Sequence, residues 1–128
     1  MNKKTVNDWI SPAYNALAEH GIAVDGKVKN NYRKQIASFG AAISTGSLKA
    51  AVAFFSDRGS ASVKREKLMT AILGILQKEE IAPESCESLY QYVDQNELEA
   101  KEPILNATIA LKLAMNLYHL EEEKIKND

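Results

Sequence analysis

Apolar residues recur every three or four positions along most of the chain, the spacing of one face of an α-helix. The first such stripe consists of Val6, Ile10, Ala13 and Leu17, with Trp9 beside it. Gly21 follows at a position suited to ending a helix. The pattern therefore predicts an N-terminal helix with one buried face.

A second helix is predicted over residues 30–46, and its two sides differ. The apolar side consists of Tyr32, Ile36, Phe39 and Ile43. The remaining surface begins with Arg33 and Lys34 and then carries only small side chains from Ala37 to Ser44. So smooth a surface permits close approach, either of another helix in the same molecule or of a separate macromolecule. The sequence leaves both interpretations open.

Further helical segments follow along the chain. Two of them are predicted over residues 47–56, with Ser47 as N-cap, and over residues 60–80, with Ser60 or Ser62 as N-cap. A short helix is predicted over residues 84–93. The last helix is predicted over about residues 103–123, and its sequence is apolar nearly all round. Asp25-Gly26 is a turn signal that allows a tight hairpin, though one too short to found a sheet. We expect an all-α fold, a compact bundle of five or six helices, in a single domain over residues 1–128.

The net charge of −1 conceals a polarised sequence. Residues 27–67 carry nine basic and two acidic residues, a net charge of +7. Residues 68–128 carry five basic and twelve acidic residues, a net charge of −7. This asymmetry indicates one side that faces a polyanion and another that faces a different partner, unless folding mixes the charges in space.

Composition narrows the class of protein. A single cysteine, Cys86, rules out an intramolecular disulfide and fits a reducing cytoplasm. The N-terminus lacks the apolar run of a signal peptide, and no stretch approaches the roughly 18 apolar residues of a membrane span. We therefore expect a cytoplasmic protein without membrane contact.

Few residues suit catalysis or metal binding. The histidines and cysteine do not form a group with metal-ligand spacing, so we expect no metal and no cofactor. Cys86 shares a predicted helical stripe with Leu89, Tyr90 and Val93, which favours a packed thiol over a nucleophile. His20 lies at a helix C-terminus, where a favourable dipole interaction explains it. We expect a protein that is not an enzyme.

Basic residues near helix starts are the stronger functional signal. Arg33 and Lys34 follow Lys27 and Lys29, and a second group lies near the start of the predicted 60–80 helix. Positive side chains in the first turn of a helix are repelled by the positive end of the helix dipole. A bound phosphate would offset this repulsion. Without interleaved aromatic residues, contact with a nucleic-acid backbone is favoured over base stacking.

The segment YRKQIASFGAAISTGSLKAAVAFF, residues 32–55, resembles the signature of a known family. Tyr32-Arg33 lies at the start of a helix that contains Gly40 and ends at Gly46. A second, alanine-rich helix follows and ends in aromatic residues at Phe55. These elements resemble the small helical subunit of type III-B (Cmr) CRISPR effector complexes. The small subunit of type III-A (Csm) complexes is a similar helical protein and a near alternative.

The resemblance implies a setting and a role. It implies that the chain is a non-catalytic subunit of a cytoplasmic antiviral ribonucleoprotein. Copies of this subunit would stack beside the backbone subunits and near the large subunit. It also implies contact with guide RNA and target RNA through phosphates, blind to base identity. The residues expected to make that contact are Arg33, Lys34, Lys49, Lys64, Arg65 and Lys67. This interpretation requires those side chains to gather on one side of the folded molecule.

Two other hypotheses are open. The chain could be a pure protein–protein scaffold whose basic face meets an acidic partner. It could also be an unrecognised small enzyme, such as a hydrolase that uses Cys86.

Overall fold

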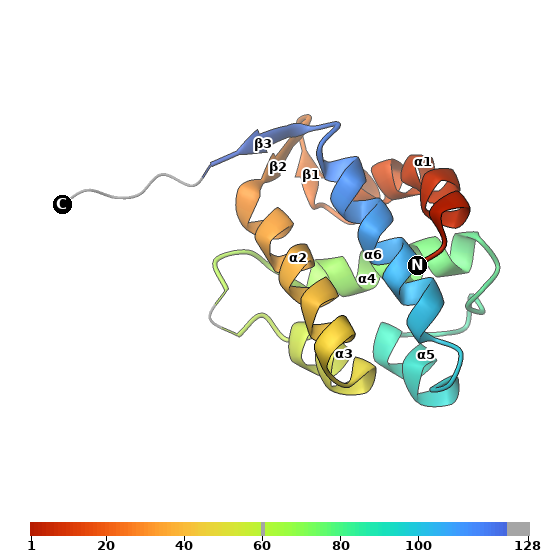
Figure 1. Cartoon of the computed structure of the whole chain (residues 1–128). Coiled ribbons are helices and arrows are strands. Elements are labelled where there is room, and N and C mark those ends of the chain that lie inside the picture. The colour runs from red at the N-terminus through yellow and green to blue at the C-terminus, as the bar shows by residue number, and fades with distance from the viewer. Residues whose placement is uncertain (60, 123–128) are drawn as a thin grey trace.

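The computed structural model describes residues 1–59 and 61–122 as a mainly helical protein. The helices within these residues are α1 (Lys3–Glu19), α2 (Asn30–Thr45), α3 (Leu48–Phe55), α4 (Glu66–Lys78), α5 (Leu89–Gln95) and α6 (Lys101–Met115). The strands are β1 (Ala23–Val24), β2 (Lys27–Lys29) and β3 (His119–Glu121). The predicted all-α fold of five or six helices is confirmed, with a small sheet added at one end (Figure 1).

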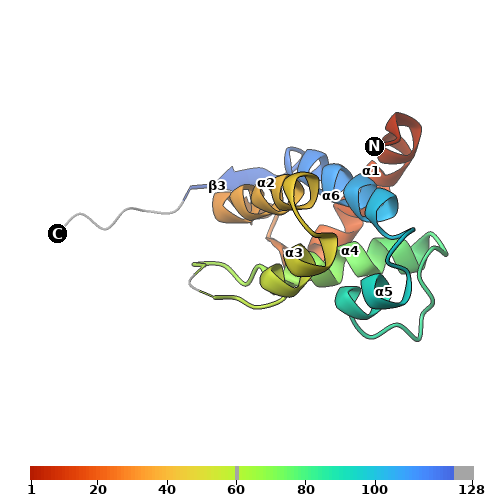
Figure 2. The ribbon, with the colours of Figure 1, turned by 60° about the horizontal axis from the view of Figure 1, so that its bottom comes forward.

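Helix α6 lies at the centre of the bundle, as its apolar sequence predicts. It contacts α1, α2 and α4. Figure 2 shows α2 and α6 in one layer, with α3, α4 and α5 in a second layer beneath them. Ala107, Ala110 and Ala114 of α6 are fully buried, and their small side chains let neighbouring helices approach from several sides.

The predicted buried faces are largely confirmed. In α2, Tyr32, Ile36, Phe39 and Ile43 are the buried residues, as expected from their spacing. In α1 the buried face includes Trp9, whereas Ile10 is only partly buried against the core. The stripe of α1 is therefore rotated slightly toward Trp9 relative to the prediction.

The start of α4 differs from the prediction. Ser47 does cap α3, accepting a hydrogen bond from the Ala50 N–H, but Ser62 lies ahead of α4 without capping it. Ser60 lies outside the described residues. Helix α4 begins at Glu66, and the side chain of Arg65 just before it hydrogen bonds to the backbone carbonyls of Phe54 and Asp57.

The helix predicted to reach residue 123 ends at Met115, and residue 123 itself lies outside the described residues. Beyond Met115 the chain turns and forms β3. Tyr118 explains the turn: its ring stacks on Tyr14 with centroids 4.4 Å apart, and its hydroxyl donates to the Tyr14 carbonyl. Strand β3 then pairs in parallel with β2, which provides hydrogen-bond partners for its backbone.

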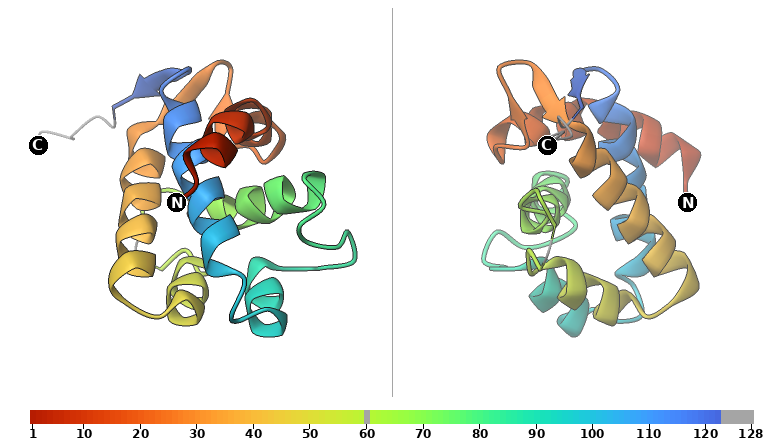
Figure 3. Two further views of the ribbon diagram at one scale, coloured as in Figure 1. Left: turned by 45° about the vertical axis from the view of Figure 1, so that its right-hand side comes forward. Right: turned by 90° about the vertical axis from the view of Figure 1, so that its left-hand side faces the viewer.

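The predicted Asp25-Gly26 hairpin is confirmed. Asp25 and Gly26 both have positive φ angles, 53° and 75°, as a tight turn between two short strands requires. The hairpin alone is small, but β3 adds a third strand beside β2, giving the order β1-β2-β3 (Figure 3). Val28 at the centre of β2 is fully buried, so the sheet closes this end of the core.

Candidate nucleic-acid interface

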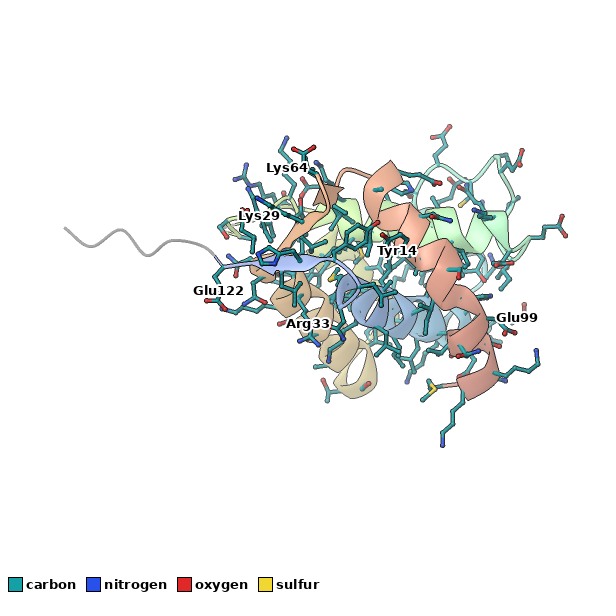
Figure 4. All side chains as sticks on the ribbon, turned by 90° about the horizontal axis from the view of Figure 1, so that it is seen from above. Tyr14, Lys29, Arg33, Lys64, Glu99 and Glu122 are labelled. Atoms are coloured by element: carbon teal, nitrogen blue, oxygen red, sulfur yellow. The ribbon has the colours of Figure 1, made fainter. Side chains whose placement is uncertain are left out.

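A cleft of about 560 Å³ lies between the β1–β2 hairpin and the loop that leads into α4. Five basic side chains line it, and we call this site the basic cleft: Lys27, Lys29, Arg58, Lys64 and Lys67. Asp25 and Glu121 are the acidic residues of its lining. In Figure 4, Lys29 and Lys64 lie together on one side of the sheet. The cleft therefore collects an excess of positive charge from segments far apart in the sequence.

Strand alternation positions two of these lysines. Lys27 and Lys29 are exposed on either side of the buried Val28, because successive side chains of a strand point to opposite faces. Lys67, in the first turn of α4, donates from Nζ to the Gly21 carbonyl at 3.4 Å and is half-buried. The hairpin and α4 thus form facing walls of the cleft.

Tyr32 of α2 contributes a phenol to the same lining. Burial raises the pKa of the Tyr32 phenol above 10, and a hydrogen bond with the Lys64 backbone opposes that rise. The hydroxyl therefore stays protonated at neutral pH and can donate a hydrogen bond. The same contact ties the start of α2 to the segment before α4.

The cations of the cleft are mostly available to a ligand. Lys27 reaches Glu121 at 4.0 Å, and both side chains are about half exposed, so this pair is weak. Among residues 1–59 and 61–122, Lys29, Arg58 and Lys64 make no ion pair with a carboxylate. An anionic ligand could neutralise them without breaking a strong internal pair.

The predicted site residues separate into groups. Lys64 and Lys67 line the basic cleft. Arg65, which lies between them in the sequence, does not, because it is only 8% exposed. Its Nε donates to the Asp57 carbonyl at 2.6 Å, and its Nη2 donates to the Phe54 carbonyl at 2.9 Å. Arg65 is therefore a structural residue that holds the loop.

The predicted gathering of the basic residues on one side is not observed for Arg33. Figure 4 shows Arg33 on the side of the sheet opposite Lys29 and Lys64. Its Nε donates to Asn116 Oδ1 at 3.0 Å, next to the end of α6. Lys34 is exposed on α2. These two residues belong to a surface distinct from the basic cleft.

Lys49 is occupied by an internal network at the other end of the molecule. Its Nζ lies 2.7 Å from Asp94 Oδ1 and 3.7 Å from Glu97 Oε1. Its hydrogen bond with Asp94 is the main cause that raises the pKa of the Lys49 ammonium. Lys49 is thus paired with carboxylates of the same molecule and lies outside the basic cleft.

The site predicted from the sequence lacks three of the basic lining residues: Lys27, Lys29 and Arg58. A usable signal for the two lysines was their position on either side of Val28, after a turn dipeptide, which puts both on one face of a strand. No comparable local signal marks Arg58, since its place depends on the course of the loop.

The smooth surface of α2 is divided between two uses. Gly40 faces α6, where a β-carbon would lie 3.7 Å from Thr108 Cγ2, an ordinary contact distance. Ala37, Ser38 and Ala41 remain exposed. The crossing of α2 with α6 therefore leaves room for a β-carbon at Gly40 and does not require a glycine there, while the outer small residues stay open to another macromolecule.

Acidic residues gather away from the basic cleft. A shallow hollow between α5 and α6 is lined by residues 94–99, which include Asp94, Glu97 and Glu99. Figure 4 shows Glu99 at the end of the molecule remote from Lys29 and Lys64. Leu98 in this loop is fully exposed. The polarity of the sequence thus survives folding only in part, because Lys49 pairs with Asp94 and Glu97 at this end and Glu121 lies in the lining of the basic cleft.

The residues considered for catalysis are mainly structural. Cys86 is buried as predicted, but it precedes α5 instead of lying on it, and its thiol hydrogen bonds to the Ser88 carbonyl. The tyrosine that α5 buries is Tyr92, not Tyr90. His20 caps the C-terminal end of α1 as predicted, and burial lowers the pKa of its imidazole, which favours the uncharged ring; the interaction with the helix dipole stays a prediction.

No group of three or more His, Cys, Asp or Glu side chains among residues 1–59 and 61–122 is placed to hold a metal ion. In that same part of the chain, no helix combines the length and apolarity needed to cross a membrane.

Comparison with known proteins gives one family. Residues 7–117 match a family described as CRISPR-associated protein (Cas_Cmr5). No curated protein and no solved structure shows a significant match. The matched range includes all six described helices except the first residues of α1.

Proposed function

Since the chain belongs to the CRISPR-associated Cas_Cmr5 family, we propose that it is the small, non-catalytic subunit of a cytoplasmic type III-B effector complex. In this role it associates with the large subunit, the backbone subunits and copies of itself. Its task is to help form the surface along which guide RNA and target RNA lie, in antiviral defence.

The basic cleft carries the proposed RNA contact. Five cations and a neutral phenol converge there from β2, α2, the 56–65 loop and α4. Lysine, arginine and hydroxyl groups are typical partners of phosphate oxygens, and such contacts carry no base information. A subunit that must accept any target sequence requires this kind of contact.

The acidic end supports stacking of copies. Glu99 lies at one end, together with Asp94 and Glu97, whose charge Lys49 offsets in part, and the basic cleft lies at the other. Opposite charges at opposite ends favour a head-to-tail contact between identical subunits, which extends a filament instead of closing a dimer. The exposed Leu98 would add an apolar contact to that interface.

A double variant tests the RNA contact. Lys29→Ala/Lys64→Ala removes two cleft cations that make no internal ion pair. We expect RNA affinity in the reconstituted complex to fall for every sequence tested. The matched control is Lys3→Ala/Lys101→Ala, which removes the same charge from exposed residues outside the cleft.

The same variants address the scaffold hypothesis. If the basic cleft binds an acidic protein surface, Lys29→Ala/Lys64→Ala will disrupt assembly even after nuclease treatment. RNA affinity of the assembled remainder would then stay unchanged. That outcome, or full RNA affinity in the double variant, would overturn the proposed contact.

A further inference from the structure

Phe54 is a large aromatic residue that α3 leaves in solvent. It is 63% exposed, in contrast to its neighbour Phe55, which is 4% exposed. Phe54 lines a hollow of about 350 Å³ together with Ala53, Asp57, Gly59 and Arg65. This hollow is built on the same 56–65 loop that supplies Arg58 and Lys64 to the basic cleft. The exposed ring is therefore a close neighbour of the proposed RNA contact along the chain.

The ring of Phe54 is held in place by two partners. The Arg65 guanidinium carbon lies 4.4 Å from the Phe54 ring centroid. The Phe55 ring meets Phe54 edge-on, with centroids 5.3 Å apart and an interplanar angle of 76°. Arg65 is itself buried and fixed by its hydrogen bonds to backbone carbonyls. A ligand that stacked on this ring would lose little side-chain entropy in ordering it.

The surroundings of the ring indicate what kind of ligand fits. Apart from Phe54 and Ala53, the hollow is lined by Asp57, Gly59 and Arg65, which are polar or lack a side chain. A flat group with polar edges suits such a site better than an aliphatic side chain does. Aromatic residues beside cationic grooves stack bases without regard to sequence, since every base has a π-face.

We propose that Phe54 stacks an unpaired base of an RNA strand whose phosphates occupy the basic cleft. The proposal rests on the proposed RNA contact and adds a second mode to it: cations hold the backbone, and Phe54 holds one base that is not paired. Arg65 serves as a positioning residue that supports the ring from one side. Single-stranded RNA should therefore depend on Phe54, while a fully paired duplex should not.

The test compares two probes of equal length, a 20-nucleotide oligouridylate and a 20-base-pair RNA duplex, titrated against the full chain. Phe54→Ala should weaken oligouridylate binding by roughly 5- to 100-fold, the effect of removing one stacked aromatic residue, and leave duplex binding within about twofold. Phe54→Leu keeps an apolar side chain without a π-face and should lose as much. Phe54→Trp should retain the affinity. Leu117→Ala, at an apolar residue that is equally exposed (63%) and lines neither the basic cleft nor the hollow at Phe54, is the matched control and should change neither affinity.

The outcomes separate this inference from the proposed function. If Lys29→Ala/Lys64→Ala weakens both probes but Phe54→Ala and Phe54→Leu weaken neither, the RNA contact stands and base stacking is overturned. If the unaltered protein binds neither probe, alone or in its reconstituted complex, both are overturned. If Phe54→Ala reduces co-purification of other subunits with oligouridylate affinity unchanged, the ring is a protein contact and the proposal fails. Thermal melting followed by circular dichroism checks that each variant is folded.

Discussion

A β-carbon at Gly74 of α4 would lie 2.7 Å from Nε2 of His20, which caps the end of α1. The absence of a side chain at Gly74 therefore admits the imidazole between these two helices. Gly74 lies in a helix interior, where glycine is unfavourable by about 1 kcal/mol relative to alanine. The helix accepts this cost because the space is occupied by His20.

Gly74→Ala is expected to destabilise the protein. The half-buried His20 ring must move aside, and we expect this displacement to outweigh the gain of up to about 1 kcal/mol in helix propensity. Urea unfolding followed by the fluorescence of the buried Trp9 measures the change. In a His20→Ala background the collision is gone, so the same substitution should stabilise by up to about 1 kcal/mol. A Gly74→Ala effect of the same sign in both backgrounds would contradict the contact.

The pH dependence of stability should carry a contribution from His20. Burial lowers the pKa of His20 in the folded state, even though Glu19 acts in the opposite direction. The unfolded chain therefore takes up a proton first as the pH falls below about 6.5. The contribution of His20 to the free energy of unfolding is therefore fully present above about pH 6.5. It is lost as the pH falls from there through the pKa that His20 has in the folded state.

Urea midpoints at pH 8.0, 6.5 and 5.5 measure this dependence, above the range in which most carboxylates titrate. His20→Gln should flatten the curve. A single cooperative transition in these curves would also test the prediction that residues 1–128 form one domain. Two separable transitions would count against it.

Neighbouring residues Lys64 and Arg65 should give opposite phenotypes. Arg65→Lys cannot reproduce the two guanidinium hydrogen bonds or the stack on Phe54, and we expect a loss of about 2–4 kcal/mol of stability. Lys64→Ala removes an exposed cation and should change stability by less than about 0.5 kcal/mol. Urea unfolding and RNA titration of both variants test this pairing. Equal effects of the two substitutions on stability would show that Arg65 is not a structural residue.

Salt dependence should distinguish the two basic surfaces. The logarithm of the RNA association constant falls linearly with the logarithm of the salt concentration, and each phosphate contact adds about 0.7–0.9 to the magnitude of the slope. Lys29→Ala/Lys64→Ala should reduce that slope by about one to two units. Arg33→Ala/Lys34→Ala should reduce it less, because neither residue lines the cleft and Figure 4 shows Arg33 on the side of the sheet opposite Lys29 and Lys64. If the Arg33/Lys34 variant has the larger effect, the RNA lies along α2 and not in the basic cleft.

The helices could be predicted because their signals are local. The buried stripe of α2, from Tyr32 to Ile43, follows from spacing within sixteen residues. The C-terminal run from Leu117 to Leu120 was predicted as helix because its partner is distant: β3 pairs with β2, some ninety positions earlier. Apolar composition alone does not separate a buried helix from a short buried strand.

The candidate site was predictable only in part for the same reason. Charge type identified Lys64 and Lys67 as candidates, but it could not separate them from Arg65, which turns inward to carbonyls of its own loop. Likewise, nothing near Lys49 in the sequence reveals Asp94, its partner across α3 and α5. Exposure and pairing of a charged side chain depend on the assembled fold.

The parallel pairing of β3 with β2 also sets an order of events during synthesis. The hairpin that carries Lys27 and Lys29 emerges from the ribosome early, but the strand beside it ends at Glu121. The wall of the basic cleft that the hairpin forms therefore stays incomplete until β3 has been translated. A nascent chain therefore lacks the finished binding surface until the helical core that positions it has already been made.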